Sequence, residues 1–581
     1  MSATPTTSAP PALVTAQPAG TPVLVPSMTK PPAGYRLVPR HVESVAARNA
    51  TVVAQLHRAP HLIPYVYTKG FGVWQVSWFT SPPNQQEKIQ VYVSDSTGEV
   101  TQVWSGYQVQ WTMARGYPGA FGRRVNALYV WLPLCFAFLL PFLPLALPRA
   151  LDRRPRADPG GSWVQRPSLL LLDALMLLGF SISLALFNHA DLGLSVPTVY
   201  PFLLYLLVRM LMLAFGIGRP RRIQRLFLPT PWLAVALVFL IGFRVGLDVT
   251  DSNVIDVGYA GVIGANRILF GERIYGGWPS DNPQGDTYGP VNYYAYVPFT
   301  AAFGWSGTWD DLPASHAAAI AFDLLTLLGL FLLGRMIRGP SLGVALAYCW
   351  AAYPFTLFSL SSNSNDSLVA LLLVLTLLVL RWPVARGISS ALAGFTKFAP
   401  LALAPLFARG VDPPPSRRAI VRYLLAFAGT VALVLAPVVI GGNLGPFWRD
   451  TVAYQASRPA PFSVWGLYGG LTIEQRLVQG AAVALALAVA FVPSRRGLVE
   501  VAALGAAVIL ALQLAVTYWF YLYIVWFFPL VIVALLGTEP ASPPALANAE
   551  APVPDSQTQR LELLAPGASV LLQPPPAEEL Q

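Results

Sequence analysis

The sequence predicts an all-α polytopic membrane protein with a small α+β domain near its N-terminus. Of the 581 residues, 55% are hydrophobic and only 11% are charged, whereas roughly a quarter of the residues of an ordinary soluble domain are charged. The hydrophobic residues also gather in separate runs of about twenty residues, a length that crosses a bilayer as a helix. A water-soluble globular fold is therefore excluded, and the lipid bilayer is the first partner that the sequence implies.

The net charge of +10 comes almost wholly from arginine. Arginines clustered between apolar runs are typical of cytoplasmic loops, so we expect no nucleic-acid partner. Cys135 and Cys349 both lie inside apolar runs, which argues against a disulfide framework or a thiolate metal site. The only lysines are Lys30, Lys69, Lys88 and Lys397.

The N-terminal region predicts a disordered arm followed by a folded domain. Residues 1–34 are mostly Pro, Ala, Thr and Ser with almost no charge, a composition typical of disorder. Residues 35–120 have the patterns of a small α+β domain, with a helix over 41–58 and strands over 73–79, 89–94 and 100–104. The helix, the first strand and the hairpin resemble a PepSY-type module over part of this region.

The rest of the chain predicts N-terminal membrane helices in residues 121–230, a membrane core in 231–537 and a disordered Pro-, Ala- and Glu-rich tail in 538–581. With two further apolar runs at 291–304 and 388–408, we expect about 11 to 13 membrane segments. The predicted spans are 127–147, 169–187, 198–216, 231–247, 313–334, 341–358, 366–381, 421–440, 477–492, 498–515 and 517–536.

The basic loops predict the orientation, because arginine-rich loops stay in the cytoplasm. The C-terminus is then cytoplasmic, and the arginine-poor segments lie outside, including 248–312 and 441–476. The runs 291–304 and 388–408 would each begin and end on one side, as half-spanning or re-entrant elements that line a cavity. The alternative is that one basic loop breaks the rule. The N-terminal domain falls outside, unless the proline-containing span 127–147 is a hairpin.

Three carboxylates, Asp248, Asp251 and Asp256, follow the span that ends near residue 247. A carboxylate beside a low-dielectric wall has a raised pKa, which suits a general base that takes a hydroxyl proton. Asp248 has an ordinary alternative, an ion pair with Arg244 one helical turn earlier. Asp256 begins an amphipathic stretch that we expect to lie in the membrane interface and to hold this carboxylate in place.

The loop that begins at Asp256 contains a series of acidic, aromatic, glycine and proline residues: Asp256, Tyr259, Gly271, Tyr275, Tyr288, Gly289 and Pro290. This pattern resembles the first exterior loop of glycosyltransferase family 87, within the GT-C superfamily of integral-membrane glycosyltransferases that use polyprenyl-phosphate sugars. The chain departs from the family's Tyr-Pro-Pro at Gly289. Two later segments, Asn363 to Asp366 and Ala393 to Pro400, are similar to further elements of that family, the second containing a Lys-x-x-Pro motif.

The resemblance implies a GT-C-like fold and an inverting hexosyl or pentosyl transfer at the extracytoplasmic face of the cell membrane. Asp256 would deprotonate an acceptor hydroxyl on a glycolipid, glycan or cell-wall component, which attacks the anomeric carbon of a polyprenyl-phosphate sugar. The departing phosphate needs positive charge. Arg458 and Lys397 are the candidates, although Lys397 lies too deep if its segment enters from the cytoplasm, and Arg458 is equally compatible with a solvated loop charge.

Sugar or acceptor binding is expected from Tyr259, Tyr288, Asn363, Asn365 and Asp366, because aromatic faces stack on pyranoses and amides bind hydroxyls. The polar run from Asn363 to Asp366 has an alternative role as a helix N-cap. Asp248, Asp251 and Asp256 could also gather a divalent cation, Mg²⁺ or Mn²⁺, although their spacing is not a metal-binding motif.

Two other classes of protein stay open. A transporter or flippase of lipid-linked or other substrates would have half-helices in two related halves and buried charge near the midplane. A non-catalytic assembly or sensor protein would work through the PepSY-like module. The concentration of carboxylates in one exterior loop favours the enzyme.

Overall fold

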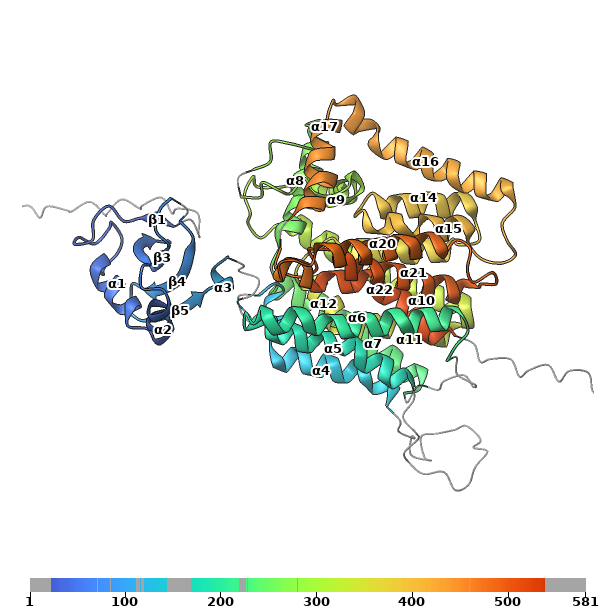
Figure 1. The fold of residues 1–581 in the computed structure, drawn as a ribbon, viewed down its shortest axis with the longest axis horizontal. Helices are drawn as coiled ribbons and strands as arrows, with labels where there is room; N and C mark the ends of the chain where they lie inside the picture. The colour runs from blue at the N-terminus through green and yellow to red at the C-terminus, as the bar shows by residue number, and fades with distance from the viewer. Residues whose placement is uncertain are drawn as a thin grey trace, which may run out of the picture.

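The computed structural model describes residues 22–538, apart from 71, 84, 111–114, 116–119, 144–168, 219–225, 227, 280 and 459. It consists of a small sheet domain and a large set of helices that lie side by side (Figure 1). Most of the arm predicted for 1–34 and nearly all of the tail predicted for 538–581 fall outside the described residues.

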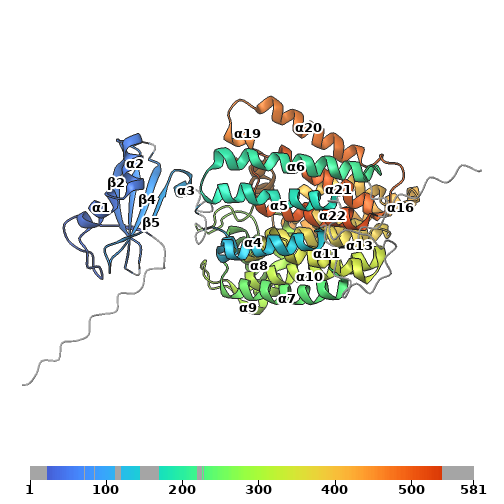
Figure 2. The same cartoon turned by 90° about the horizontal axis from the view of Figure 1, so that it is seen from below.

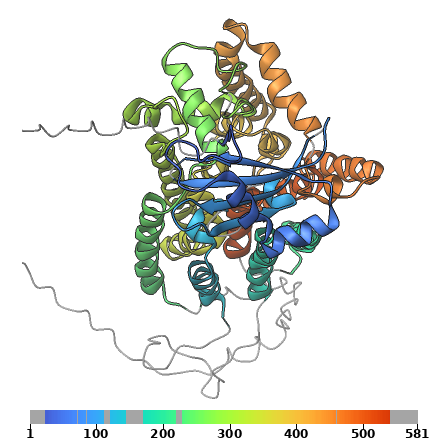
Figure 3. The ribbon, with the colours of Figure 1, turned by 90° about the vertical axis from the view of Figure 1, so that its left-hand side faces the viewer.

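The small domain is a five-stranded antiparallel sheet in which each strand pairs with its neighbour in sequence. Its buried core contains Val42, Trp74, Val76 and Val91 among other apolar residues. The sheet lies in front of the helices when the molecule is seen from the sheet side (Figure 3). Its elements are β1 (Val23–Leu24), α1 (Pro39–Ala47), α2 (Ala50–Arg58), β2 (Ile63–Thr68), β3 (Val73–Phe79), β4 (Glu87–Ser94), β5 (Val100–Ser105) and α3 (Tyr107–Gln110).

The structure corrects three expectations for this domain. The arm was expected to be disordered to residue 34, but β1 forms the edge of the sheet, with Val23 opposite Thr68. The sequence analysis missed β2, whose pairing with β3 supplies the neighbour that β1 needs. The single helix expected over 41–58 is divided in two, because Asn49 caps the second helix through its side chain, which accepts a hydrogen bond from the Thr51 amide.

Six helices of the described residues are long and apolar enough to cross a membrane, or seven if α11 (Pro340–Ala352) and α12 (Pro354–Ser361), which meet at 60°, form one broken span. Figure 2 places α7 and α20 (Thr472–Ala488) at opposite edges of the helical layer. Both carry exposed apolar side chains, among them Phe239 and Leu477, as lipid-facing helices would. The six are α5 (Leu169–Asn188), α6 (Leu192–Ala214), α7 (Thr230–Thr250), α10 (Pro313–Arg338), α16 (Arg417–Ile440) and α21 (Leu498–Ala515).

The other predicted spans coincide with shorter helices: α4 (Leu128–Leu139) with η3 (Leu140–Phe142), α13 (Asp366–Leu378), α20, and α22 (Ile524–Gly537) preceded by η6 (Tyr521–Tyr523). Trp131 of α4 donates a hydrogen bond to Ser181 Oγ of α5, at 3.1 Å. Residues 128–142 contain no hairpin turn. The alternative that 127–147 forms a hairpin is therefore wrong for the part of this span that the structure describes.

The helices have two distinct ends. At one end, the short helix η2 (Arg123–Asn126), which follows the sheet domain, is held against the end of α7, where Arg124 pairs with Asp251 at 2.5 Å. The Gly122 amide also donates to Asn253 Oδ1, at 2.7 Å. The sheet domain therefore lies at the same end as the predicted acidic loop, as Figure 1 shows.

Arginines gather at the opposite end. Arg338 at the end of α10 donates to the carbonyl of Leu536 in α22, at 2.9 Å, and the Arg496 amide before α21 donates to Asp412, at 2.6 Å. Arginine-rich loops that the sequence assigned to one side of the membrane are thus neighbours in the fold. The basic stretches at 153–156 and 219–225 lie outside the described residues.

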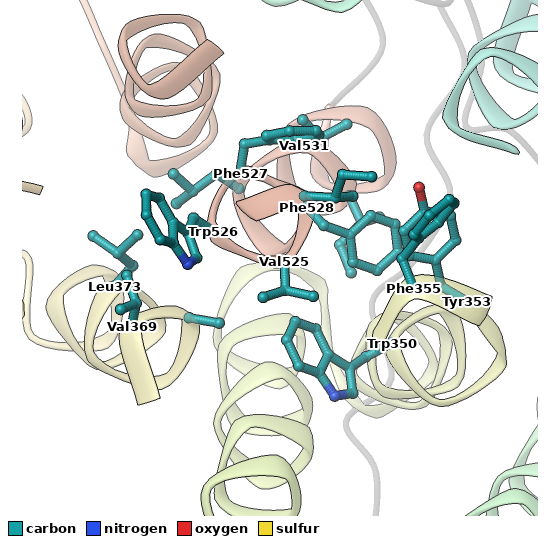
Figure 4. Packing of buried hydrophobic residues seen from close by; sticks show 14 of the residues in the cluster. Trp350, Tyr353, Phe355, Val369, Leu373, Val525, Trp526, Phe527, Phe528 and Val531 are labelled. Atoms are coloured by element: carbon teal, nitrogen blue, oxygen red, sulfur yellow. The ribbon is translucent and has the colours of Figure 1, made fainter. Parts of the chain in front are cut away.

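The core of the helical part is built around α22. Trp526 and Phe528 project from it in different directions, Trp526 toward Val369 and Leu373 and Phe528 toward Tyr353 and Phe355 (Figure 4). Phe527 contacts Phe180 of α5. Tyr353 stacks on Phe528 with ring centroids 4.1 Å apart. A helix that is apolar on every side must be buried on every side, and α22 is therefore central.

The two apolar runs predicted to be half-spanning form short helices. Residues 290–303 form α9, and residues 383–409 form α14 (Pro383–Gly394), η4 (Ala399–Leu403) and α15 (Ala404–Arg409). Arg386 near the start of α14 donates to the carbonyls of Leu380 and Ala408, which joins the two ends of this segment. The segment is a hairpin with Lys397 at its tip, and its position in a membrane stays a prediction.

Candidate functional site

Asp256 is the first residue of α8 (Asp256–Leu269). A carboxylate in the first turn is favoured by the partial positive charge of the helix N-terminus. Its backbone carbonyl accepts a hydrogen bond from Asn282 Nδ2, at 2.9 Å, which ties this turn to the following loop.

The sequence analysis expected α8 to lie in the membrane interface, and this is wrong. Residues 257–265 are all buried, because glycines three residues apart let other elements approach the helix backbone. A Cβ at Gly261 would overlap the ring of Tyr296, and one at Gly264 the ring of Tyr293; both tyrosines come from α9 (Pro290–Phe303). This close packing fixes the position of Asp256.

The Asp256 side chain is accessible to water, yet surrounding protein atoms raise its pKa above the usual value, while Arg458 and Lys397 lower it. The two cations are therefore close enough to act on the carboxylate. A raised pKa with access to water suits a general base.

Lys397 forms a buried ion pair with Asp366, with Nζ 2.5 Å from Oδ1. Trp526 Nε1 donates to the same oxygen, at 2.8 Å. The ammonium also lies over three aromatic rings, 5.1 Å from Trp526, 5.5 Å from Tyr288 and 5.6 Å from Tyr523. The cation is thus held in one place by charge and by cation–π contacts.

Arg458 reaches the site from a separate segment, just after α18 (Tyr454–Ser457). Its guanidinium lies 3.9 Å from the ring centroid of Tyr518 and 5.6 Å from that of Tyr454. The Tyr454 hydroxyl donates to Gln284 in the loop before α9. This segment begins with α17 (Leu444–Phe447) and the π-helix η5 (Trp448–Ala453), and π-helical turns are frequent at functional sites.

Tyr288 lies among these charges. Burial raises its pKa well above the usual value, Asp256 raises it further, and Arg458 lowers it. The phenol stays protonated at neutral pH, so it donates or accepts hydrogen bonds but does not act as a base. Asp366 is engaged by Lys397, which leaves Asp256 as the base candidate among these residues.

Five predicted residues therefore meet: Asp256, Tyr288, Asp366, Lys397 and Arg458. They come from α8, the loop before α9, the start of α13, the tip of the hairpin and the loop after α18. The sequence analysis did not name Tyr523 and Trp526 as site residues, because an aromatic residue in an apolar run carries no signal that separates a site from a core.

The other predicted residues have partners elsewhere. Asp248 is buried and lies 3.2 Å from His316 Nδ1, and Asp251 pairs with Arg124. The expected alternative of an Asp248 pair with Arg244 is wrong, because Arg244 pairs with Asp323 at 2.5 Å. The hydrogen-bond and ring contacts of Tyr259 lie outside the group: it is buried, donates to Asp281 at 3.1 Å and stacks on Trp309.

Asn363 and Asn365 are buried and serve the fold. Asn363 donates to Ser252 Oγ at 3.0 Å, and Asn365 donates to Asn292 Oδ1 at 2.7 Å. The alternative role of the polar run as an N-cap is seen in part: Ser364 Oγ accepts a hydrogen bond from the Asp366 amide at 3.4 Å, whereas the Asn365 side chain makes no cap hydrogen bond. In the described part of the chain, no three His, Cys, Asp or Glu side chains gather in a way that could hold a metal ion.

Gly289, the departure from the family pattern, has a structural reason. Its amide donates to the Thr396 carbonyl at 3.2 Å, and a Cβ there would lie 1.9 Å from the Phe395 carbonyl oxygen. Proline has no amide hydrogen to donate, and any side chain would push the hairpin tip away. Glycine at this position lets α9 meet the tip that carries Lys397.

The fold and the site define a largely helical protein that is suited to a membrane and has a charged, aromatic site at one end of its helices. No protein-family model matches the sequence, and no curated protein matches it.

Proposed function

We propose that this protein is an integral-membrane glycosyltransferase that moves a monosaccharide from a polyprenyl-phosphate donor to a glycolipid, glycan or cell-wall acceptor at the extracytoplasmic face. The observation that carries the proposal is a water-accessible carboxylate, Asp256, with a raised pKa and two cations, Lys397 and Arg458, close enough to lower it. The reaction requires a base for the acceptor hydroxyl and positive charge for the departing phosphate. The resemblance of the motifs to family 87 supports the same reaction.

In the proposed reaction Asp256 accepts the proton of the acceptor hydroxyl as its oxygen bonds to the anomeric carbon. The bond between that carbon and the phosphate oxygen breaks, and the polyprenyl phosphate leaves with the electron pair. Attack opposite to the departing group inverts the anomeric centre. Lys397 and Arg458 offset the negative charge that develops on the phosphate as it departs.

Aromatic residues supply the remaining part of the site. Tyr288, Tyr518 and Tyr523 are half-buried, so their rings present both an apolar face and an accessible edge. Such rings suit the apolar face of a sugar. No step of the proposed reaction uses a metal ion, and the role of Mg²⁺ or Mn²⁺ considered from the sequence stays a prediction.

The decisive experiment measures transfer from a panel of short-chain polyprenyl-phosphate hexoses and pentoses by the purified protein. Asp256→Asn keeps volume and hydrogen bonding but removes the proton acceptor, so turnover should fall by about two to four orders of magnitude. Donor binding should change little. Asp251→Asn is the matched control, because its carboxylate comes from the same loop but pairs with Arg124.

Near-normal turnover in Asp256→Asn, with loss of turnover in Asp251→Asn, would transfer the role of base to Asp251. Full activity in both variants would leave the proposed reaction without its base.

A transporter is the second candidate, because two short helical elements meet at their tips. The Val291 amide of α9 donates to the Phe395 carbonyl, at 3.1 Å, next to the bond of Gly289. A buried ion pair between Arg244 and Asp323 lies among the helices. Half-helices and buried charges are typical of transporters. Flux of a lipid-linked sugar across proteoliposomes without product formation would favour this class.

A further inference from the structure

A pocket of about 830 Å³ lies at the arginine-rich end of the helices, and none of the residues that form the site of Asp256 lines it. It is enclosed by the ends of α10, α13 and α22 and the beginnings of α14, α16 and α21. Its charged lining residues are Arg381, Arg386, Arg409, Asp412 and Glu500.

The two carboxylates of this pocket accept hydrogen bonds from an arginine side chain and from backbone amides. Asp412 accepts from Arg409 Nη2 at 3.0 Å and from the Arg496 amide at 2.6 Å. Glu500 accepts from the Gly497 amide at 2.7 Å and caps α21. The three arginines of the lining outnumber its two carboxylates.

The arginines differ in how they are held. Arg386 is buried and bonded to two carbonyls, but its Nε has no hydrogen-bond partner among the described residues, and the same is true of Nη1 of Arg409. Arg381 is exposed at the rim. A buried guanidinium with an unmet donor favours an anion nearby.

The rest of the lining is apolar and reaches the surface. Met336 is 49% exposed and Trp382 is 60% exposed, although both lie beside the pocket. A tryptophan at the end of a membrane helix is typical of the headgroup level of a bilayer. The pocket thus combines arginines with an apolar wall, as the binding of a phosphate and an acyl chain requires.

We propose that this pocket binds an anionic phospholipid, with its phosphate on Arg381 and the positive wall of the pocket and an acyl chain against the apolar lining. Basic pockets between membrane helices are suited to acidic headgroups. Arg386 and Arg409 lie at the two ends of the hairpin that carries Lys397. A lipid bound here would therefore stabilise these two ends of the hairpin. The proposal does not depend on glycosyl transfer.

The test is lipid retention by the full-length protein, measured by native mass spectrometry after extraction from nanodiscs of mixed phosphatidylcholine and phosphatidylglycerol. Wild type should retain phosphatidylglycerol in preference to phosphatidylcholine. Arg381→Ala should lower that preference by about fivefold, and Arg381→Lys should keep part of it. Arg418→Ala is the matched control, since Arg418 is an exposed arginine at the same end that does not line the pocket.

Equal retention of both lipids by wild type, or an equal loss in the Arg418→Ala control, would overturn the proposal. A third arm adds inorganic phosphate to the extracted protein. Displacement of phosphatidylglycerol by low millimolar phosphate would show that the pocket serves a soluble phosphate compound, which would also overturn a lipid site. A size-exclusion profile and melting temperature for each variant separate loss of binding from loss of fold.

Discussion

Three aspartates between the last turn of α7 and the first turn of α8 have different roles because each one faces different groups. Asp248 lies against His316, Asp251 against Arg124, and Asp256 against water and two cations. Their chemistry is identical, and their separation along the chain is small. The partner contributed by another element decides whether a carboxylate supports the fold or is accessible to a substrate.

The pKa of Asp256 predicts the pH dependence of transfer. A base works only when deprotonated, and burial raises this pKa, so activity should be lost as pH falls through a value above the usual ~3.9 of aspartic acid. Arg458 lowers the pKa of Asp256, so Arg458→Gln should move the rising limb of kcat/KM to higher pH. The measurement is kcat/KM against pH with the purified variants.

The control for this pH shift is Arg449→Gln. Arg449 lies on the same segment but is exposed and pairs with Asp450 at 2.7 Å. Its removal should leave the rising limb in place. A shift of the limb to lower pH in Arg458→Gln, or equal shifts in both variants, would contradict the assignment of Asp256 as the base.

At the scale of elements, the site depends on a contact between two short segments. The hairpin of α14, η4 and α15 carries Lys397 at its tip, and α9 begins where its backbone bonds to that tip. The contact is made by backbone atoms, so it requires a close approach rather than a particular pair of side chains. Gly289 permits that approach.

Gly289→Ala should therefore impair the protein although it adds a single methyl group. The Cβ would overlap the Phe395 carbonyl, and overpacking of this kind costs about 1 to 3 kcal/mol. We expect a lower melting temperature and lower turnover, because Lys397 moves away from Asp256. The measurements are thermal unfolding in detergent and transfer by the purified variant.

Gly242→Ala is the control for Gly289→Ala, because a Cβ at Gly242 in α7 would meet no atom within 4 Å. Its melting temperature should stay the same or rise, since alanine favours a helix over glycine. Unchanged stability and turnover in Gly289→Ala would show that the tip contact is dispensable.

At the scale of the whole molecule, the two ends of the helices differ in chemistry. One end carries the sheet domain, the acidic loop and the aromatic site; the other carries the arginines and the pocket beside Trp382. Because arginine-rich ends stay in the cytoplasm, this arrangement predicts that sheet domain and site lie together outside.

Single cysteines test this orientation in intact cells, in a background lacking Cys135 and Cys349. Cysteine at Thr97 of the sheet domain and at Ser306 after α9 should both react with an impermeant thiol reagent, whereas cysteine at Arg495 should not. All three positions are exposed, so differences in labelling report the side of the membrane. Labelling at Arg495 alone would invert the orientation, and opposite labelling of Thr97 and Ser306 would contradict the arrangement of the sheet domain.

The sequence by itself determined the helical class, the positions of the apolar helices and most of the sheet. Hydrophobic runs and alternation are local patterns, and a helix satisfies its own backbone hydrogen bonds. Local patterns did not predict segments whose structure depends on an element distant in the sequence. β1 is a strand only because β2 lies beside it. The apolar stretch after Asp256 is buried against α9 instead of lying at an interface.

Part of the candidate site could be predicted from the sequence. Three of its charged residues lie in or near apolar runs: Asp256, Lys397 and Arg458. A charge is costly in such surroundings, so its presence there indicates a function. Only the tertiary structure decided that Asp366 holds Lys397, that Tyr523 and Trp526 surround it, and that Asp248 and Asp251 belong to other contacts. Burial, charge proximity and pKa depend on groups brought together from distant parts of the chain, and no local pattern encodes those distances.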